Sequence, residues 1–169
     1  DANPDLEKPW LSAQPQDSFL NICISSGDCK DAGLDFFRFN DGAMSTANPE
    51  QAKRLIKKGW RPKDRVRVQA LSLSALADLI IEQEYNKPDI ISIDLEMINF
   101  LENLPYFLRK LNPRLLCMEC VNDSVNLRTL YSSNEFKSLA ASGYEPIALI
   151  GGNIFAVPTQ ISDIASEFQ

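Results

Sequence analysis

The feature that most constrains the fold is a series of short, continuous apolar runs, separated from one another by helix-like patterns. The strongest run covers residues 89–95, and comparable runs lie at 19–25 and 114–121. Strands that are apolar on both faces are typical of a parallel sheet buried between two layers of helices. The sequence therefore predicts an α/β fold, in which helices cover both faces of a mostly parallel sheet.

Capping residues and amphipathic spacing predict the helices between these runs. Thr46 or Asn48 can cap a helix over residues 49–58, and Ser72 or Ser74 can cap the next helix. The other expected elements are a short helix before residue 14, strands at 34–39 and 65–71, helices at 98–110 and 133–142, and a closing hairpin of strands 144–150 and 153–158 around Gly151-Gly152. The hairpin would add an antiparallel strand to the sheet.

Length and charge limit the classes of partner. The 169 residues fit one compact domain, and we expect residues 1–169 to form a single domain. The net charge of −6 disfavours nucleic acid and anionic membrane surfaces, because both select clustered Lys and Arg. No apolar run approaches the roughly 20 residues that a membrane span needs. We therefore expect neither a nucleic acid nor a membrane as partner.

Two of the four cysteines, Cys117 and Cys120, have the C-x-x-C spacing of many metal and redox sites. They lie in a predicted strand, where residues three apart face opposite sides and cannot converge on one ion. The chain also has no histidine to complete a mixed site. We expect reduced, buried thiols, no metal at these cysteines and a cytoplasmic protein.

Acidic side chains leave the predicted strands where ligands bind in open α/β sheets, beyond the carboxyl ends. Asp94 and Glu96 follow the strongest strand, and at i and i+2 they project to the same side. Burying two carboxylates is costly, so we expect a specific partner or ligand to hold them. Glu119, near the end of the next strand, either joins them or pairs with a buried donor.

Four short motifs follow one another along the chain: Asp1-Ala2-Asn3-Pro4, Ile93-Asp94-Leu95-Glu96, Cys117-Met118-Glu119, and Gly143-Tyr144 with Gly152-Asn153-Ile154-Phe155-Ala156. In this order and spacing they resemble the acid-x-Asn-Pro step, the Ile-Asp-x-Glu signature, the x-x-Glu strand end and the closing hairpin of the FkbM family of methyltransferases. The likeness covers nearly the whole chain. Three features depart from the family pattern: Met97 replaces a usual Gly, Ser74 replaces a usual acid, and the N-terminal glycine-rich cofactor segment is absent.

The resemblance implies a Rossmann-like, three-layer αβα methyltransferase domain that uses S-adenosylmethionine. It assigns cofactor binding to four residues. Asp1 would accept hydrogen bonds from the ribose hydroxyls and Asn3 would shape the turn, while Ser25 and Asp28 would lie near the adenine. A domain without the first strand of the family would leave one sheet position open, which either the missing segment itself or a partner such as a second copy of the chain would fill.

The resemblance also implies methyl transfer to an oxygen of a sugar or small natural product. Such a displacement depends on alignment, and it needs a base only where the acceptor carries a proton. Asp94 and Glu96 would act as that base, as orienting groups or as ligands of a divalent cation. Glu119 would contact the substrate.

Three other functions fit parts of the sequence. The first is a non-catalytic binding or scaffolding protein that keeps the methyltransferase fold, which Met97 and the absent loop favour. The second is a nucleotide-binding oxidoreductase of Rossmann type, which the closing hairpin disfavours. The third is a metallohydrolase built on Asp94, Glu96 and Glu119.

Overall fold

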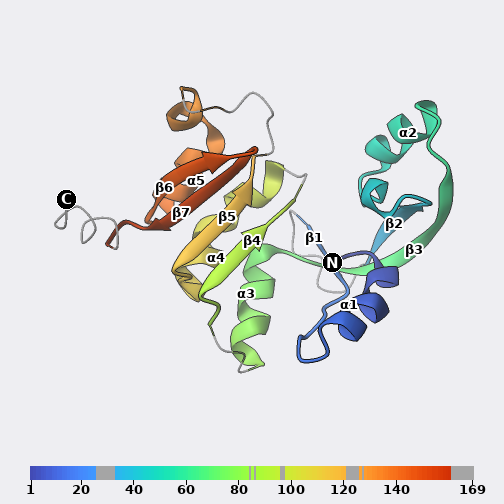
Figure 1. Ribbon diagram of the computed structural model, residues 1–169, viewed down its shortest axis with the longest axis horizontal. Coiled ribbons are helices and arrows are strands. Elements are labelled where there is room, and N and C mark those ends of the chain that lie inside the picture. The colour runs from blue at the N-terminus through green and yellow to red at the C-terminus, as the bar shows by residue number, and fades with distance from the viewer. Residues whose placement is uncertain are drawn as a thin grey trace. The chain divides into compact units, whose positions relative to one another are not determined.

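The computed structural model describes residues 1–25, 33–83, 85, 87–95, 98–120, 126 and 128–160. It is an α/β structure with two compact units, Asp1–Leu71 and Ser72–Gln169 (Figure 1). Asp28 and Glu96 lie outside the described residues. Each unit contains one sheet, and the single domain expected from the sequence stays a prediction.

The sheet of the first unit has the strand order β1-β3-β2. The central strand β3 (Pro62–Leu71) pairs in parallel with β1 (Ile22–Ile24) and antiparallel with β2 (Leu34–Phe39). Along β3 the apolar residues from Val66 to Ala70 alternate with exposed polar ones, as expected for a strand with one buried face. The predicted strand at 65–71 is confirmed and begins three residues earlier.

Short helices flank this sheet, namely η1 (Pro4–Leu6), α1 (Glu7–Ala13), η2 (Gly42–Met44) and α2 (Pro49–Lys57). The predicted cap of α2 is confirmed, because Oδ1 of Asn48 accepts hydrogen bonds from the main-chain N–H groups of Glu50 and Gln51. α2 buries Ala52 and Leu55 against Phe39 of β2. A second cluster, Cys23, Phe36 and Val68, joins the three strands.

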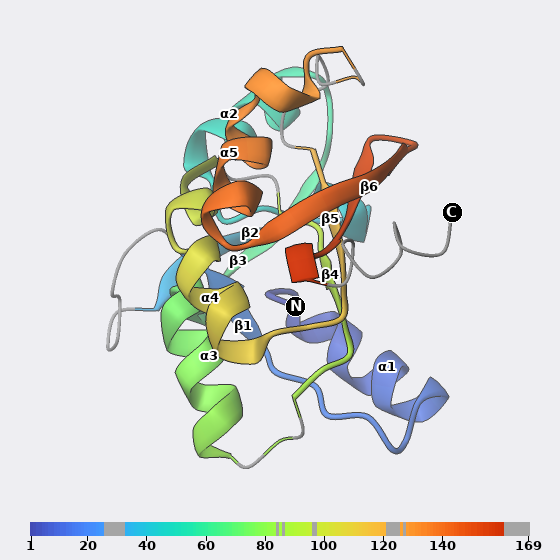
Figure 2. The ribbon, with the colours of Figure 1, turned by 90° about the vertical axis from the view of Figure 1, so that its left-hand side faces the viewer.

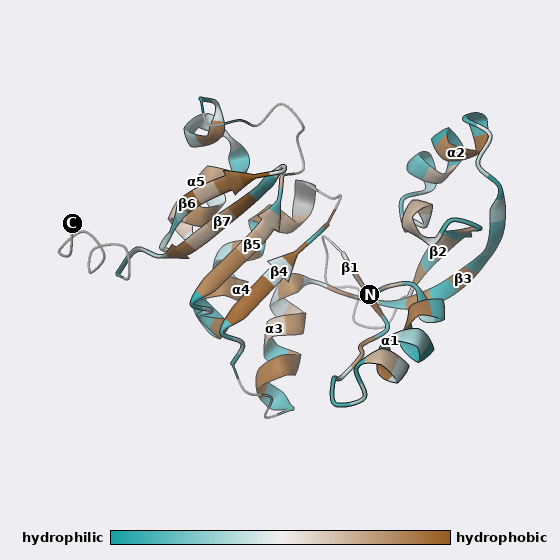
Figure 3. Cartoon of the chain, viewed as in Figure 1, coloured by the Kyte–Doolittle hydropathy of each residue, from teal (hydrophilic) through white to brown (hydrophobic). Residues whose placement is uncertain are grey.

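The sheet of the second unit has the order β4-β5-β7-β6. β4 (Ile90–Ile93) pairs in parallel with β5 (Leu115–Glu119), whereas β7 (Asn153–Pro158) runs antiparallel to both β5 and β6 (Tyr144–Ile150). The predicted hairpin is therefore confirmed. Figure 3 shows that β5 and β7 are predominantly apolar, and Leu116, Met118 and Ile154 are fully buried.

The helices of the second unit are α3 (Leu73–Glu82), η3 (Ile98–Glu102), α4 (Leu104–Leu111), η4 (Leu130–Ser132) and α5 (Asn134–Ala141). Figure 2 shows α3, α4 and α5 on one side of the strands of this sheet. Ser72 caps α3 and Ser133 caps α5 through their hydroxyl groups. α4 buries Leu104, Leu108 and Leu111, which explains their helical spacing.

Two sequence predictions about the fold need correction. The described strands form two mixed sheets rather than one mostly parallel sheet. The antiparallel pairs of the closing hairpin were expected, but the antiparallel pairing of β2 with β3 was not. The helix predicted at 98–110 is divided into η3 and α4. Pro105 has no backbone N–H and is favoured only in the first turn, so α4 begins at Leu104.

Among the helices of the described residues, none is both long and apolar enough to cross a membrane.

Candidate functional site

Asp94, one of the two predicted catalytic carboxylates, lies in the second unit, at the carboxyl edge of its parallel strands. Ile93 of β4 is opposite Met118 of β5 in register. The next residues, Asp94 and Glu119, therefore leave the sheet at the same edge, and the next strand places Asn153 opposite Glu119. The structure thus brings together two of the three acidic residues that the sequence assigned to this edge.

Asp94 differs from the sequence prediction in its environment. Its side chain is exposed, as is that of Glu119. The cost of burying a carboxylate, which the sequence argument used, does not apply to an exposed side chain. Both carboxylates are accessible from solvent, so the case for a ligand at this edge rests on their position at the strand ends.

The cysteines show no site in the described part of the chain, where Cys23, Cys117 and Cys120 are free thiols. Cys117 is half-buried and Cys120 is buried one residue beyond the end of β5. Burial raises the pKa of the Cys120 thiol, with smaller contributions from Glu135 and Glu119, so this thiol is poorly suited to act as a thiolate. Within the same described residues, no three His, Cys, Asp or Glu side chains gather as metal ligands.

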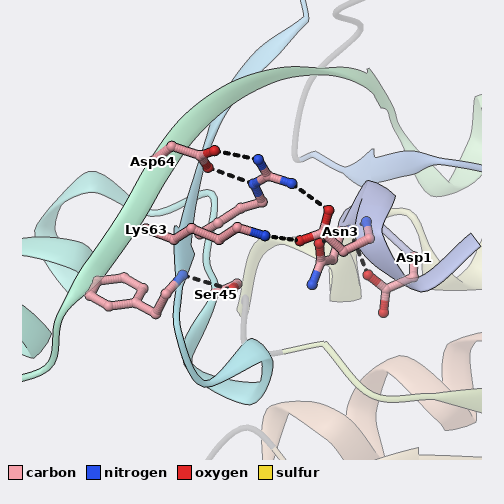
Figure 4. A network of polar contacts seen from close by, with 8 residues as sticks. Asp1, Asn3, Ser45, Lys63 and Asp64 are labelled. Carbon is pink, nitrogen blue, oxygen red and sulfur yellow. Dashed lines mark hydrogen bonds and ion pairs between the residues drawn. The ribbon is translucent and has the colours of Figure 1, made fainter.

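The turn at Asp1–Asn3 is the predicted ribose site, and it lies in the first unit. Oδ1 of Asp1 accepts a hydrogen bond of 2.6 Å from the main-chain N–H of Asn3. Oδ1 of Asn3 accepts one of 3.1 Å from the N–H of Asp5 and caps η1, so Asn3 shapes this turn (Figure 4). The side-chain amide of Asn21 donates to the main-chain oxygen of Asp1 over 3.1 Å. The predicted cofactor contacts of Asp1 and Asn3 stay predictions.

Ser25 lies at the other end of β1. Its main-chain N–H donates to the oxygen of Leu71 over 2.8 Å, and the residue is buried. Asn21, which contacts Asp1, precedes β1, and Ser25 follows it four residues later. At about 3.3 Å per residue, the two ends of β1 are roughly 13 Å apart along the strand. Asp1 and Ser25 would therefore contact different parts of one extended ligand.

An ion-pair network that the sequence analysis missed holds the turn in place. Nη1 of Arg38 and Nζ of Lys63 each bind one carboxylate oxygen of Asp5 over 2.6 Å. Arg38 also binds both carboxylate oxygens of Asp64 on the neighbouring strand (Figure 4). We call Asp5, Arg38, Lys63 and Asp64 the Arg38 network. The mixed charges at 63–67 are compatible with ion pairs between neighbouring strands. The contact with Asp5 joins segments that are far apart in the sequence, so no local pattern indicates it.

These charges lower the pKa values of two carboxyl groups. The hydrogen bond from Lys63 is the main cause of the lowered pKa of Asp5, and the hydrogen bond from Arg38 is the main cause for Asp64. The pKa of Arg38 is raised, chiefly by its bond to Asp64. The network therefore favours the charged forms of all three groups.

Comparisons of the chain with protein-family models, with curated proteins and with solved structures found no significant match.

Proposed function

We propose that the chain is an S-adenosylmethionine-dependent methyltransferase that resembles the FkbM family, with a hydroxyl of a sugar or small natural product as acceptor. The observation that carries the proposal is the strand order β4-β5-β7-β6, in which the antiparallel strand β7 lies between β5 and β6. A dehydrogenase of Rossmann type would continue with a parallel strand at this position. The three-layer Rossmann-like domain belongs to this proposal.

The acidic edge of the second unit supports the proposal. Asp94 follows β4, Glu119 is the last residue of the neighbouring parallel strand β5, and both are exposed, so an acceptor can reach both carboxylates. Glu96, two residues after Asp94, is assigned to the same site from the sequence. In this assignment Asp94 and Glu96 orient the acceptor hydroxyl and take its proton, while Glu119 contacts the rest of the acceptor.

The turn at Asp1 fits the ribose of a nucleoside cofactor. One carboxylate oxygen of Asp1 binds Asn3, and the other has no partner among the described residues. An oriented carboxylate with a free oxygen can accept from the ribose hydroxyls. Asn3 is buried at the base of the turn, and Ser25 and Asp28 are assigned to the adenine.

The proposed reaction is a displacement at carbon. The bound cofactor supplies an electrophilic methyl group on a cationic sulfur. The acceptor oxygen forms the new bond to the methyl carbon, the carbon–sulfur electron pair stays on sulfur, and the hydroxyl proton passes to a carboxylate at Asp94 or Glu96. Alignment of the acceptor and exclusion of water are what these residues would contribute most.

A non-catalytic binding protein with the same fold is the second candidate. Met97 replaces the glycine usual in the signature, and Asp94 is exposed rather than held in a desolvated site. Catalytic carboxylates usually lie in sites from which water is excluded, so the exposure of Asp94 favours the second candidate.

Calorimetric titration of S-adenosylmethionine and S-adenosylhomocysteine into the protein tests the proposal. We expect binding that weakens by at least about tenfold in Asp1→Ala, because a charge-assisted hydrogen bond is lost. Asp17→Ala, an exposed acid in the same unit, is the matched control and should bind like the parent. Absence of binding would leave the second candidate.

A further inference from the structure

A shallow, open groove of about 630 Å³ lies in the first unit, and one of its lining residues, Gly42, is next to the side chain of Asn3. Its two walls are Asn40–Gly42, which follows β2, and Gly59–Arg61, which follows α2. We propose that this groove binds a saccharide ring, which stacks on Trp60 and accepts and donates hydrogen bonds at Asn40, Asp41 and Arg61. The proposal concerns binding alone and goes beyond the methyl transfer proposed above.

Trp60 is held in place by the end of α2. Gly59 has a φ of 92°, and its N–H donates to the oxygen of Ile56 over 3.0 Å. The N–H of Trp60 donates to the oxygen of Leu55 over 3.1 Å, which completes a Schellman motif. Leu55 is buried in the core beneath this turn, while the tryptophan itself is 37% exposed. The backbone of Trp60 is therefore held in place, and its side chain is partly exposed to solvent.

The opposite wall is also fixed by its backbone. The N–H of Asn40 donates to the oxygen of Arg61 over 3.3 Å, which joins the two walls. Oδ1 of Asp41 accepts from the N–H of Ala43 over 3.1 Å and caps η2. A ligand would find this backbone already ordered, which lowers the entropy cost of binding.

The polar groups of the groove are available to a ligand. Among the described residues, the side chains of Asn40 and Arg61, the indole N–H of Trp60 and the second carboxylate oxygen of Asp41 have no hydrogen-bond partner. An amide, a carboxylate and a guanidinium together offer donors and acceptors in planar, paired arrangements. Such pairs match the neighbouring hydroxyls of a sugar ring, and they are not needed for the fold.

The same chemistry disfavours other ligands. Apolar ligands bind in grooves lined mainly by apolar side chains, and Trp60 is the one large apolar side chain that lines this groove. Phosphate groups select several cations or a helix N-terminus, whereas Arg61 shares the groove with the carboxylate of Asp41. A pyranose ring combines a face of C–H groups, which suits an indole, with hydroxyls at its rim, which suit the polar walls.

Tryptophan fluorescence offers a direct test because the chain has two tryptophans, Trp10 and Trp60. In Trp10→Phe the remaining fluorescence comes from Trp60. We would titrate this variant with the methyl glycosides of glucose, galactose and mannose, without any cofactor. The expected result is a saturable change in emission with at least one glycoside.

Side-chain variants then assign the binding to the groove. In the Trp10→Phe background, Asn40→Ala and Arg61→Ala should each raise the dissociation constant of the glycoside at least about fivefold, because each removes from the groove a group that hydrogen-bonds to the ligand. Lys57→Ala, an exposed cation on α2 that does not line the groove, should leave the constant unchanged. Calorimetry with Trp60→Ala should show no heat of binding.

Two results would overturn the proposal. One is the absence of a saturable change in emission with all three glycosides, whether or not inorganic phosphate binds. The other is a saturable change in emission whose dissociation constant is the same in Asn40→Ala and Arg61→Ala as in the parent. Because no cofactor is present, either result is independent of the outcome for S-adenosylmethionine.

Discussion

Arg38 of β2 donates from Nη1 to Oδ1 of Asp5 over 2.6 Å, although the two residues are 33 positions apart in the sequence. The same guanidinium binds Asp64 across the sheet, and its side chain is only 13% exposed. One arginine thus joins the turn that carries Asp1 and Asn3 to the strand pair β2–β3. The stability and the geometry of this turn should depend on Arg38.

Replacement of Arg38 is the first test of this dependence. Arg38→Met keeps most of the aliphatic side chain but leaves Asp5 and Asp64 without their shared cation, so the midpoint of urea unfolding should fall. The matched control is Lys53→Met, which breaks the exposed pair with Glu50, in which both side chains are 68% exposed. Exposed pairs of this kind contribute little, so the control midpoint should stay near that of the parent. Equal effects of the two variants would contradict the role of the network.

Replacing Asp5 and Asp64 one at a time distinguishes the effect of the Arg38 network on the turn from its effect on the sheet. Each aspartate forms bonds with Arg38 and is similarly exposed, at 46% and 43% of the side chain. Only Asp5 belongs to the helical turn that Asn3 caps. We expect Asp5→Asn to weaken binding of S-adenosylhomocysteine several-fold more than Asp64→Asn does, if the cofactor binds at Asp1. Calorimetry measures the dissociation constant of S-adenosylhomocysteine for each variant. Equal dissociation constants would show that the network does not position the turn.

Acid should weaken the first unit through the same carboxylates. The pKa values of Asp5 and Asp64 are lowered in the folded chain from the ordinary value of 3.8. The unfolded chain therefore takes up these protons first as the pH falls, and the stabilisation is present above pH 3.8 and lost below it. Urea midpoints measured between pH 6 and pH 3 should fall less steeply in Arg38→Met than in the parent. A parallel decline of the two proteins would argue against the network as the cause.

Tyr144 should give the opposite pH dependence, in which stability is lost as the pH rises. Its hydroxyl donates to the oxygen of Pro113 over 2.7 Å, and burial raises its pKa from 10.0 to about 12. The unfolded tyrosine ionises first as the pH rises, so this stabilisation is present below pH 10 and lost through about pH 12. Tyr144→Phe should cost about 1–2 kcal/mol near neutral pH, because the Pro113 oxygen loses its donor.

Unfolding curves between pH 7 and pH 12 check this prediction. The alkaline loss of stability should be smaller in Tyr144→Phe than in the parent. Tyr131→Phe is the control, because Tyr131 is 69% exposed and should leave both the midpoint and its alkaline decline unchanged.

Local signals in the sequence predicted the elements of the fold well. The apolar runs on either side of Gly151-Gly152 form the predicted hairpin, and Asn48 and Ser133 cap the predicted helices. These features depend on neighbouring residues only. The antiparallel pairing of β2 with β3 was missed, because strand direction depends on how the chain returns and not on the apolar pattern.

The candidate sites likewise combine features that the sequence indicated with features that depend on tertiary packing. The common edge of Asp94 and Glu119 follows from two strands in parallel register, which the sequence indicated. The exposure of Asp94 and the contact of Asp5 with Arg38 depend on tertiary packing, which no local pattern encodes. The groove at Trp60 was missed for the same reason, since its walls come from residues about twenty positions apart.

Asp94 is the residue whose replacement best distinguishes an enzyme from a binding protein. If Asp94 takes the acceptor proton, Asp94→Asn should lower the rate of methyl transfer about 10²- to 10⁴-fold and leave binding of S-adenosylhomocysteine unchanged. The control is Asp89→Asn, an exposed aspartate at the opposite end of the same strand, where its main-chain oxygen accepts bonds from Arg114 and Leu115. The measurement is transfer of a labelled methyl group to a panel of hydroxylated acceptors. Because the two variants remove the same charge from the two ends of β4, a loss of rate in both would indicate a structural effect, and a loss in Asp94→Asn alone would assign the chemistry to the carboxyl edge.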